Sequence, residues 1–363
     1  MQAPTTAEHR AARRRMSYVT PENCAKVLSR SAYWTRQFLD LYLDRCDEAG
    51  SHHPHQGYVL SRQAPELAAR IRVGGGPGDF SNEPERASAR VIALAVAGSC
   101  ARSFGRFDEA ELSLKWARDL AESTRLTPQA VCELVRRSAA LKCDTAEPDA
   151  EIWVDRAVQV AERLENEANL ADALVLQGFF LSAAGRGGSD RLAQGASLAN
   201  LKSLRGRRTF EAAIYNMALG AVRSGNPVEA ARWLKRVKKR LARHPASIQK
   251  ARVVWLEGYF SGELGATRYG IRQLEKVRRR FLDMAALPDF VLCSIDLLDL
   301  QMSEGDEVAV GLTLGETVDA VNAAWNLPTL DLRAFLERYV AVAAGLPERS
   351  REKAALAEDL QAL

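Results

Sequence analysis

The segment AVAGSCARSFGRFDEAELSLKWA (95–117) decides the fold. On both sides of Gly105, small and apolar residues recur at positions i, i+3, i+4 and i+7, which is the pattern of a helix with one buried stripe. The pattern predicts a first helix over 89–104 and a second helix over 107–123. A glycine between them suits the left-handed residue at which many helices end, because glycine has no side chain to clash there.

The turn glycine recurs along most of the chain. Six glycines fall on one 40-residue register, in which only Thr145 breaks the series: Gly105, Gly185, Gly225, Gly265, Gly305 and Gly345. Such a repeat indicates a stack of similar units, since one helix pair cannot bury both of its faces. The alternative, a generic α-helical bundle, would make the register a coincidence. We therefore predict an all-α, right-handed α-solenoid of about seven antiparallel helix pairs over 89–363, without a sheet.

The composition agrees with a folded, helical protein. The chain has 363 residues, of which 47% are apolar, 26% are charged and 7% are aromatic. This is enough apolar material for a sizeable core. No secretory signal or membrane-spanning stretch is visible, and the six cysteines have no CxxC spacing. We therefore expect free thiols, a cytoplasmic location and no membrane partner.

Three segments share an order of small residue, Gly, Ala, large residue and Ala: 95–117, MALGAVRSGNPVEAARWLKRV (217–237) and LEGYFSGELGATRYGIRQLEKV (256–277). This order resembles the tetratricopeptide repeat (TPR) family, and the resemblance covers residues 89–363. The period of 40 exceeds the 34 residues commonest in that family, which implies slightly longer helices. The unit at 129–168 lacks the turn glycine, and the second helix of the unit at 169–208 is polar and Gly-rich, so local geometry should differ there.

The resemblance implies a binding surface. In TPR proteins the first helices line a concave groove and the second helices form the convex face. Carried over position by position, the groove-facing candidates are Arg102, Phe179, Tyr215, Arg223, Arg252, Trp255, Tyr259, Asp299, Met302 and Tyr339. Aromatic residues, Arg and Met are enriched at interfaces. We thus expect a non-enzymatic scaffold or regulatory/adaptor subunit that binds a protein partner, alone or within a larger complex. A receptor for a peptide or small ligand is an alternative use of the same groove.

Charge is segregated along the chain. Residues 201–281 hold 20 Lys and Arg against 5 Asp and Glu, while residues 282–363 hold 5 against 15. Basic residues of two consecutive second helices stack in register and form a basic ridge: Lys235, Arg236, Lys238, Lys239, Arg240, Lys276, Arg278, Arg279 and Arg280. Cations near helix C-termini also suit the helix dipole, but the size of the excess indicates a polyanionic partner. A nucleic-acid-associated regulator is therefore a second hypothesis.

The first 88 residues fall into three segments. Residues 1–16 are polar and basic, and we expect a flexible tail. Residues 17–72 carry helical patterns that would cap the array, and the Gly- and Pro-containing stretch 73–88 is expected to be a loop. An alternative for 21–40 is a DNA-binding helix-turn-helix (PENCAKVL, a turn at SRS, then AYWTRQFLD), although its turn lacks a glycine and its second helix is apolar.

No motif for catalysis stands out. His52, His53 and His55 lie near Cys46 and could supply zinc ligands, but their spacing matches no known finger, and a surface turn explains them. The GGGPG stretch (74–78) lacks the strand and the Lys-Ser/Thr pair of a phosphate loop. No motif pairs a nucleophile with a base. We therefore predict no enzyme activity, no catalytic residue, no resident metal and no cofactor.

Overall fold

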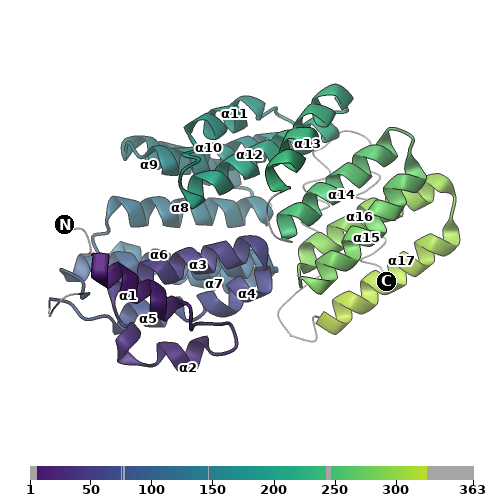
Figure 1. Cartoon of the computed structure of the whole chain (residues 1–363). Coiled ribbons are helices and arrows are strands. Elements are labelled where there is room, and N and C mark those ends of the chain that lie inside the picture. Colours follow the sequence, from purple (N-terminus) through teal and green to yellow (C-terminus); the bar gives the residue numbers. More distant parts are fainter. Residues whose placement is uncertain (1–5, 75, 77, 146, 243–246, 325–363) are drawn as a thin grey trace. The chain divides into compact units, whose positions relative to one another are not determined.

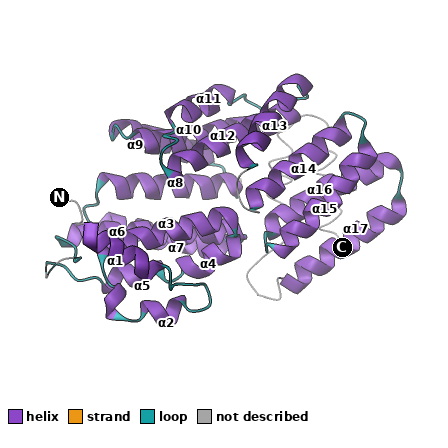
Figure 2. Cartoon of the chain, in the orientation of Figure 1, coloured by secondary structure: helices purple, strands orange, loops and turns teal. Residues whose placement is uncertain are grey.

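The computed structural model describes residues 6–74, 76, 78–145, 147–242 and 247–324 (Figure 1). Within these residues the chain forms helices and loops but no strand (Figure 2), as the all-α prediction required. The chain divides into two compact units, Met1–Leu141 and Lys142–Leu363. Among the described residues, no helix is long and apolar enough to cross a membrane.

The first unit is built around helix α3. It contains α1 (Thr6–Met16), α2 (Cys24–Leu28), the short 3-10 helix η1 (Ser31–Tyr33), α3 (Arg36–His52), α4 (Pro54–Ser61), α5 (Ala64–Arg70), α6 (Glu83–Phe104), α7 (Phe107–Ser123) and most of α8 (Pro128–Asp144). Phe38, Leu39 and Tyr42 of α3 are fully buried, because α1, α4, α5 and α6 pack around this helix. The Tyr42 hydroxyl donates to the Leu60 carbonyl at 2.5 Å, which ties α3 to α4.

Residues 6–16 do not form the flexible tail that we expected over 1–16. Residues Thr6–Met16 form α1, and this helix packs on α3. Its Ala12 is only 3% exposed, and Met16 packs against the same core. The composition of the segment gives no sign of this packing, because only one small and one large apolar residue hold an otherwise basic helix against the core.

The helix-turn-helix alternative for 21–40 is wrong. Helix α2 has only five residues, and the next helix begins at Arg36, after Thr35 has capped it by accepting a hydrogen bond from the Phe38 amide at 3.3 Å. A recognition helix must present its side chains to a DNA groove. Phe38 and Leu39 instead form the centre of the first unit's core.

The loop after α5 is shorter than the expected 73–88. Helix α6 begins at Glu83, where the Asn82 side chain accepts a hydrogen bond from the Glu85 amide at 2.9 Å and Pro84 occupies the first turn. Both are favourable helix-start residues. An isolated bridge joins Val73 to Phe80, and Phe80 is buried, so part of this loop is anchored to the core.

The second unit is a stack of helix pairs. It contains α9 (Ala150–Arg163), α10 (Glu167–Ala183), α11 (Ser189–Leu198), α12 (Leu204–Arg223), α13 (Pro227–Leu241), α14 (Ile248–Glu263), α15 (Thr267–Asp283), α16 (Leu287–Glu304) and α17 (Glu307–Ala324). From α10 onward the helices pack as the pairs α10–α11, α12–α13, α14–α15 and α16–α17. The last predicted pair, beyond residue 324, lies outside the described residues.

Small residues shape the turns and the helix contacts of these pairs. Gly265, between α14 and α15, has a φ of 90°, a left-handed conformation in which a side chain would be strained. Gly185, Gly225 and Gly305 have positive φ as well, and so does Gly105 between α6 and α7 of the first unit. Gly178 permits close packing of α10 on α11, since a Cβ there would lie 2.7 Å from Leu192 Cγ. Helices can therefore approach one another closely within each pair.

Candidate protein-binding face

The first helices of successive pairs lie next to one another in the second unit. Helix α10 packs on α12, α12 on α14 and α14 on α16, whereas the second helices approach one another less closely among the described residues. The first helices therefore lie on the inner side of this stack. We call the surface formed by Tyr215 of α12, Arg252, Trp255 and Tyr259 of α14 and Asp299 of α16 the first-helix face.

Arg252 is held in place by a buried carboxylate of the next first helix. Its Nε and Nη2 donate to Oδ1 and Oδ2 of Asp289 at 2.6 and 3.0 Å. Asp289 is 5% exposed, while 33% of the Arg252 side chain stays open to solvent. Burial on its own would lower the pKa of the Arg252 guanidinium, but Asp289 outweighs this effect and raises that pKa. The two parallel bonds therefore fix a permanent cation on the face.

Trp255 is fixed in a similar way. Its indole Nε1 donates to Asp296 Oδ2 at 2.8 Å, and its ring meets the edge of Phe281 at a centroid distance of 5.9 Å. Tyr259, one turn further along α14, is half-buried and packs against two neighbouring core clusters. Both rings therefore keep a defined position, with part of each exposed.

The charges of Arg252 and of the carboxylates Asp289 and Asp296 act on Tyr215. Its burial raises the pKa of the Tyr215 hydroxyl to about 12; Arg252 and Arg223 oppose this, and Asp289 and Asp296 add to it. The tyrosine on α12 thus responds to charges on α14 and α16.

We expect Tyr215 to ionise near pH 12 rather than near its ordinary value of 10. Because the folded pKa is raised, the stabilisation linked to Tyr215 is fully present below pH 10 and is lost as the pH rises from 10 to 12. An alkaline absorbance titration of the protein, compared with that of the Tyr215→Phe variant, isolates this hydroxyl. A difference curve with its midpoint at pH 10 would contradict the placement of Tyr215.

The structure does not bring all predicted groove residues together. Phe179 is half-buried on α10, and Arg223 and Met302 are exposed near the C-terminal ends of α12 and α16. Arg102 is half-buried on α6, which belongs to the first unit. Tyr339 lies outside the described residues. The first-helix face keeps five of the ten predicted groove residues, all of them on α12, α14 and α16.

Sequence reasoning missed the carboxylates that hold this face. Asp289 lies 37 residues after Arg252, and Asp296 lies 41 residues after Trp255. A similar link joins α10 to α12, where Arg205 Nε donates to Asp172 Oδ2 at 2.8 Å across 33 residues. A search for carboxylates about one repeat away from an Arg or Trp on a first helix could have found all three contacts.

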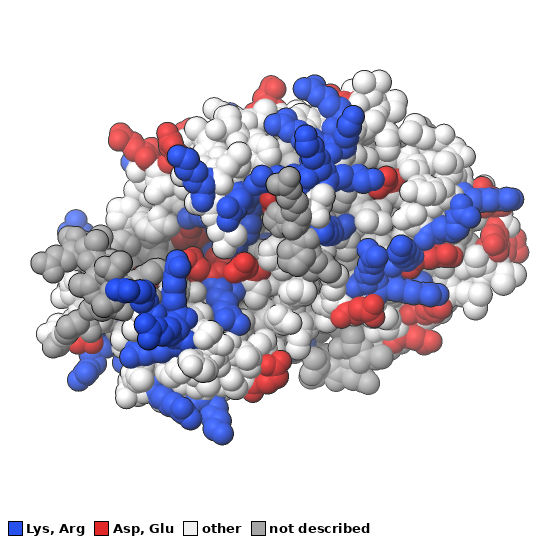
Figure 3. All heavy atoms as spheres, in the orientation of Figure 1, with Lys and Arg blue, Asp and Glu red and all other residues white. Residues whose placement is uncertain are grey.

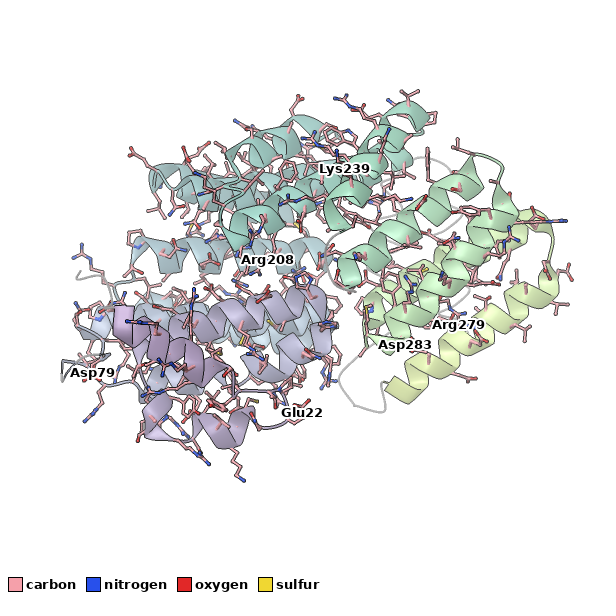
Figure 4. All side chains as sticks on the ribbon, viewed as in Figure 1. Glu22, Asp79, Arg208, Lys239, Arg279 and Asp283 are labelled. Atoms are coloured by element: carbon pink, nitrogen blue, oxygen red, sulfur yellow. The ribbon has the colours of Figure 1, made fainter. Side chains whose placement is uncertain are left out.

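Most of the basic ridge is exposed. The exposed members are Lys235, Arg236, Lys238 and Lys239 on α13 and Lys276, Arg279 and Arg280 on α15. Lys and Arg side chains gather over the region of α13 and over that of α14 and α15 (Figure 3), and Figure 4 marks Lys239 and Arg279. Lys238 pairs with Glu257 at 2.7 Å, and the half-buried Arg240 pairs with Glu211 at 3.1 Å.

Arg278 was wrongly assigned to the ridge. Its side chain is buried, with Nε donating to Ser294 Oγ at 2.8 Å and Nη1 to Glu316 at 2.8 Å. The guanidinium also lies over the Phe290 ring at 4.9 Å. Helices α16 and α17 cover this position and supply its partners, so Arg278 joins three helices instead of facing solvent.

The histidine cluster is not arranged as a metal site in the described part of the chain, where no three His, Cys, Asp or Glu side chains are placed to hold an ion. Cys46 is fully buried on α3, and burial raises the pKa of its thiol well above the ordinary value. The His55 ring packs on Phe104 at a centroid distance of 5.3 Å. No disulfide joins the six cysteines, all of which lie among the described residues.

Comparison with known proteins identifies the fold. No family model and no curated protein matches the sequence. The structure is similar to that of a Rap protein solved in complex with Competence and Sporulation Factor, with a TM-score of 0.62 and 11% identity over 89% of this chain and 96% of that chain. It is also similar to a STAND signal-transduction ATPase with a tetratricopeptide repeat sensor from Pyrococcus horikoshii, with a TM-score of 0.54 and 9% identity. That match covers 97% of this chain and 51% of the other, so this chain spans about half of that protein. The fold is that of a TPR-like helical repeat protein.

Proposed function

We propose that this protein is a non-enzymatic interaction protein, a scaffold or regulatory subunit, that binds a segment of a partner protein on the first-helix face. The observation that carries the proposal is the pair Arg252 and Trp255. Each is held by a carboxylate of the next first helix while part of its side chain stays open to solvent. Large side chains that are ordered before binding lose little conformational freedom when a partner docks.

The chemistry of the face suggests what the partner segment carries. Trp255 and Tyr259 offer apolar ring surface, which suits an apolar anchor. The open part of Arg252 and the exposed Arg223 nearby on α12 suit an acidic group beside that anchor. We therefore infer an extended segment with one large apolar residue next to one or two carboxylates.

Further support comes from the Rap protein, because that structure holds Competence and Sporulation Factor. A receptor that takes up a short peptide or small ligand on the same face is the second candidate that this likeness favours. We also propose that the array is a TPR variant with a 40-residue unit, in keeping with the positive φ of the turn glycines. A cytoplasmic location, consistent with cysteines that form no disulfide, completes the proposal.

We expect the double change Trp255→Ala and Tyr259→Ala to weaken binding of a selected peptide by roughly 2 kcal/mol, or about thirtyfold. The reason is the loss of both ring surfaces from the face. Peptides would first be selected against the full chain from a random phage-displayed library. Their affinities for wild-type and variant protein would then be measured by isothermal titration calorimetry.

A matched control exists in the first unit. Trp116 on α7 and Tyr18 are 53% and 68% exposed, so changing both to Ala removes the same two ring types from another surface. This control should bind the selected peptides like the wild type. If the two double variants weaken binding equally, or if only the Trp116 and Tyr18 variant does so, the first-helix face is not the binding surface.

A further inference from the structure

Two outer helices of the second unit carry matching rows of cations. We call the outer cationic stripe Arg232, Arg236 and Lys239 on α13 together with Arg272, Lys276 and Arg279 on α15. The spacing of four and then three residues puts each row on one side of its helix. All six side chains are exposed, and Figure 3 shows the basic groups over these regions.

Within the described part of the chain, the stripe cations have no counter-charge, whereas several other cations of the same helices do. Lys238 and Arg240 of α13 pair with Glu257 and Glu211, and Arg278 of α15 pairs with Glu316. Among the residues that the structure describes, none of the six stripe cations forms an ion pair. Cations that face neighbouring helices are thus neutralised within the fold, whereas the outward row is left open to an external anion.

The helix dipole does not explain the stripe. A dipole stabilises cations only in the last turn of a helix. Arg232 is the sixth residue of α13, and Arg272 is the sixth residue of α15. These two arginines gain nothing from the C-terminal end, so the stripe needs another explanation.

The surroundings of the stripe favour a phosphate backbone over a protein or a single strand. The exposed large apolar side chains of these helices, Val228 of α13 and Tyr269 and Leu282 of α15, lie in first or last turns rather than between the stripe cations. A protein partner would need apolar anchors among the charges. A single strand would need free aromatic faces for its bases. The Trp233 ring is already covered by Arg232 and Arg236, at 5.4 and 5.2 Å.

We propose that the outer cationic stripe binds duplex DNA through its phosphates, without reading the base sequence. Neighbouring cations on each helix stand about 5–6 Å apart, close enough together to engage successive phosphates of one strand. This surface is separate from the first-helix face. The protein can therefore hold a partner segment on one face of the stack and DNA on another.

The test is the salt dependence of DNA binding by the full chain. A fluorescein-labelled, mixed-sequence duplex would be titrated between about 50 and 200 mM salt, with fluorescence anisotropy as the readout. Six phosphate contacts predict a slope of log K against log salt of about −5, since each contact contributes about −0.9. Changing all six stripe residues to Gln should bring that slope toward zero and weaken binding at least about a hundredfold at low salt.

Control variants show whether a loss of DNA binding comes from the stripe itself, from the lower net charge or from misfolding. A variant with six other exposed cations changed to Gln (Arg13, Arg14, Lys26, Arg30, Lys115 and Lys202) should keep most of the wild-type slope. The α13 triple and the α15 triple, each with the wild-type circular dichroism spectrum, should lose about half of the slope. The proposal is overturned if the wild type does not bind the duplex, if the stripe and control variants lose affinity equally, or if single-stranded DNA or polyglutamate binds more tightly than the duplex.

Discussion

Replacing Arg137 by Met should lower the free energy of unfolding by about 3 kcal/mol, because it breaks the buried pair with Glu133 and the half-buried pair with Asp47. The Arg137 side chain is 6% exposed, and its two Nη atoms donate to Asp47 at 2.9 and 2.6 Å. Its Nε donates to Glu133 at 3.1 Å. Burial on its own would lower the pKa of Arg137, but Asp47 and Glu133 outweigh it and hold that pKa above its ordinary value. Met fills similar space but leaves Asp47 without this partner, while Arg136 still contacts Glu133.

Urea denaturation followed by circular dichroism measures this loss. The matched control is Arg186→Met, which breaks the exposed pair of Arg186 with Glu151 at 2.8 Å. Exposed pairs contribute about 0–1 kcal/mol, so this change should have little effect. Equal losses in the two variants would show that the ion pairs of Arg137 stabilise the fold no more than an exposed pair does.

Ala230→Arg should destabilise the second unit by at least about 3 kcal/mol, because it adds both overpacking and a buried charge. Ala230 on α13 is fully buried in a cluster with Ala218 and Leu234, so no space exists for a guanidinium. The control is Val228→Arg on the same helix, where the residue is 80% exposed. That change should stay within about 0.5 kcal/mol. Thermal unfolding gives the melting temperature of both variants. A melting temperature unchanged by Ala230→Arg would contradict the packing of α12 on α13.

The sequence predicted those parts of the fold that depend on local patterns. The helix ends at Phe104 and Phe107 match the expected turn around Gly105, because amphipathic spacing and a left-handed glycine act over a few residues. Helix α1 was missed, since its stability comes from packing on α3. A short basic helix with few apolar residues gives no local signal of such a contact.

In the candidate site, too, the sequence predicts what depends on local patterns and misses what depends on packing between distant segments. Tyr215, Arg252, Trp255 and Tyr259 could be chosen from their residue types and their repeat positions. Asp289, which fixes Arg252, could not be chosen in this way, because the contact depends on the packing of α14 against α16. The burial of Arg278 has a similar cause: its partners lie 16 to 39 residues further along the chain. Its register equivalent, Lys238, stays exposed.

Photo-cross-linking of a selected peptide would locate the surface on which the peptide binds. A benzophenone group placed at the apolar anchor of the peptide would be activated in the complex with the full chain, and the adducts would be mapped by mass spectrometry. We expect adducts within α12, α14 and α16, concentrated around Trp255 and Tyr259, and their loss in the Trp255→Ala and Tyr259→Ala variant. Adducts confined to the second helices α13 and α15, or to the first unit, would contradict it.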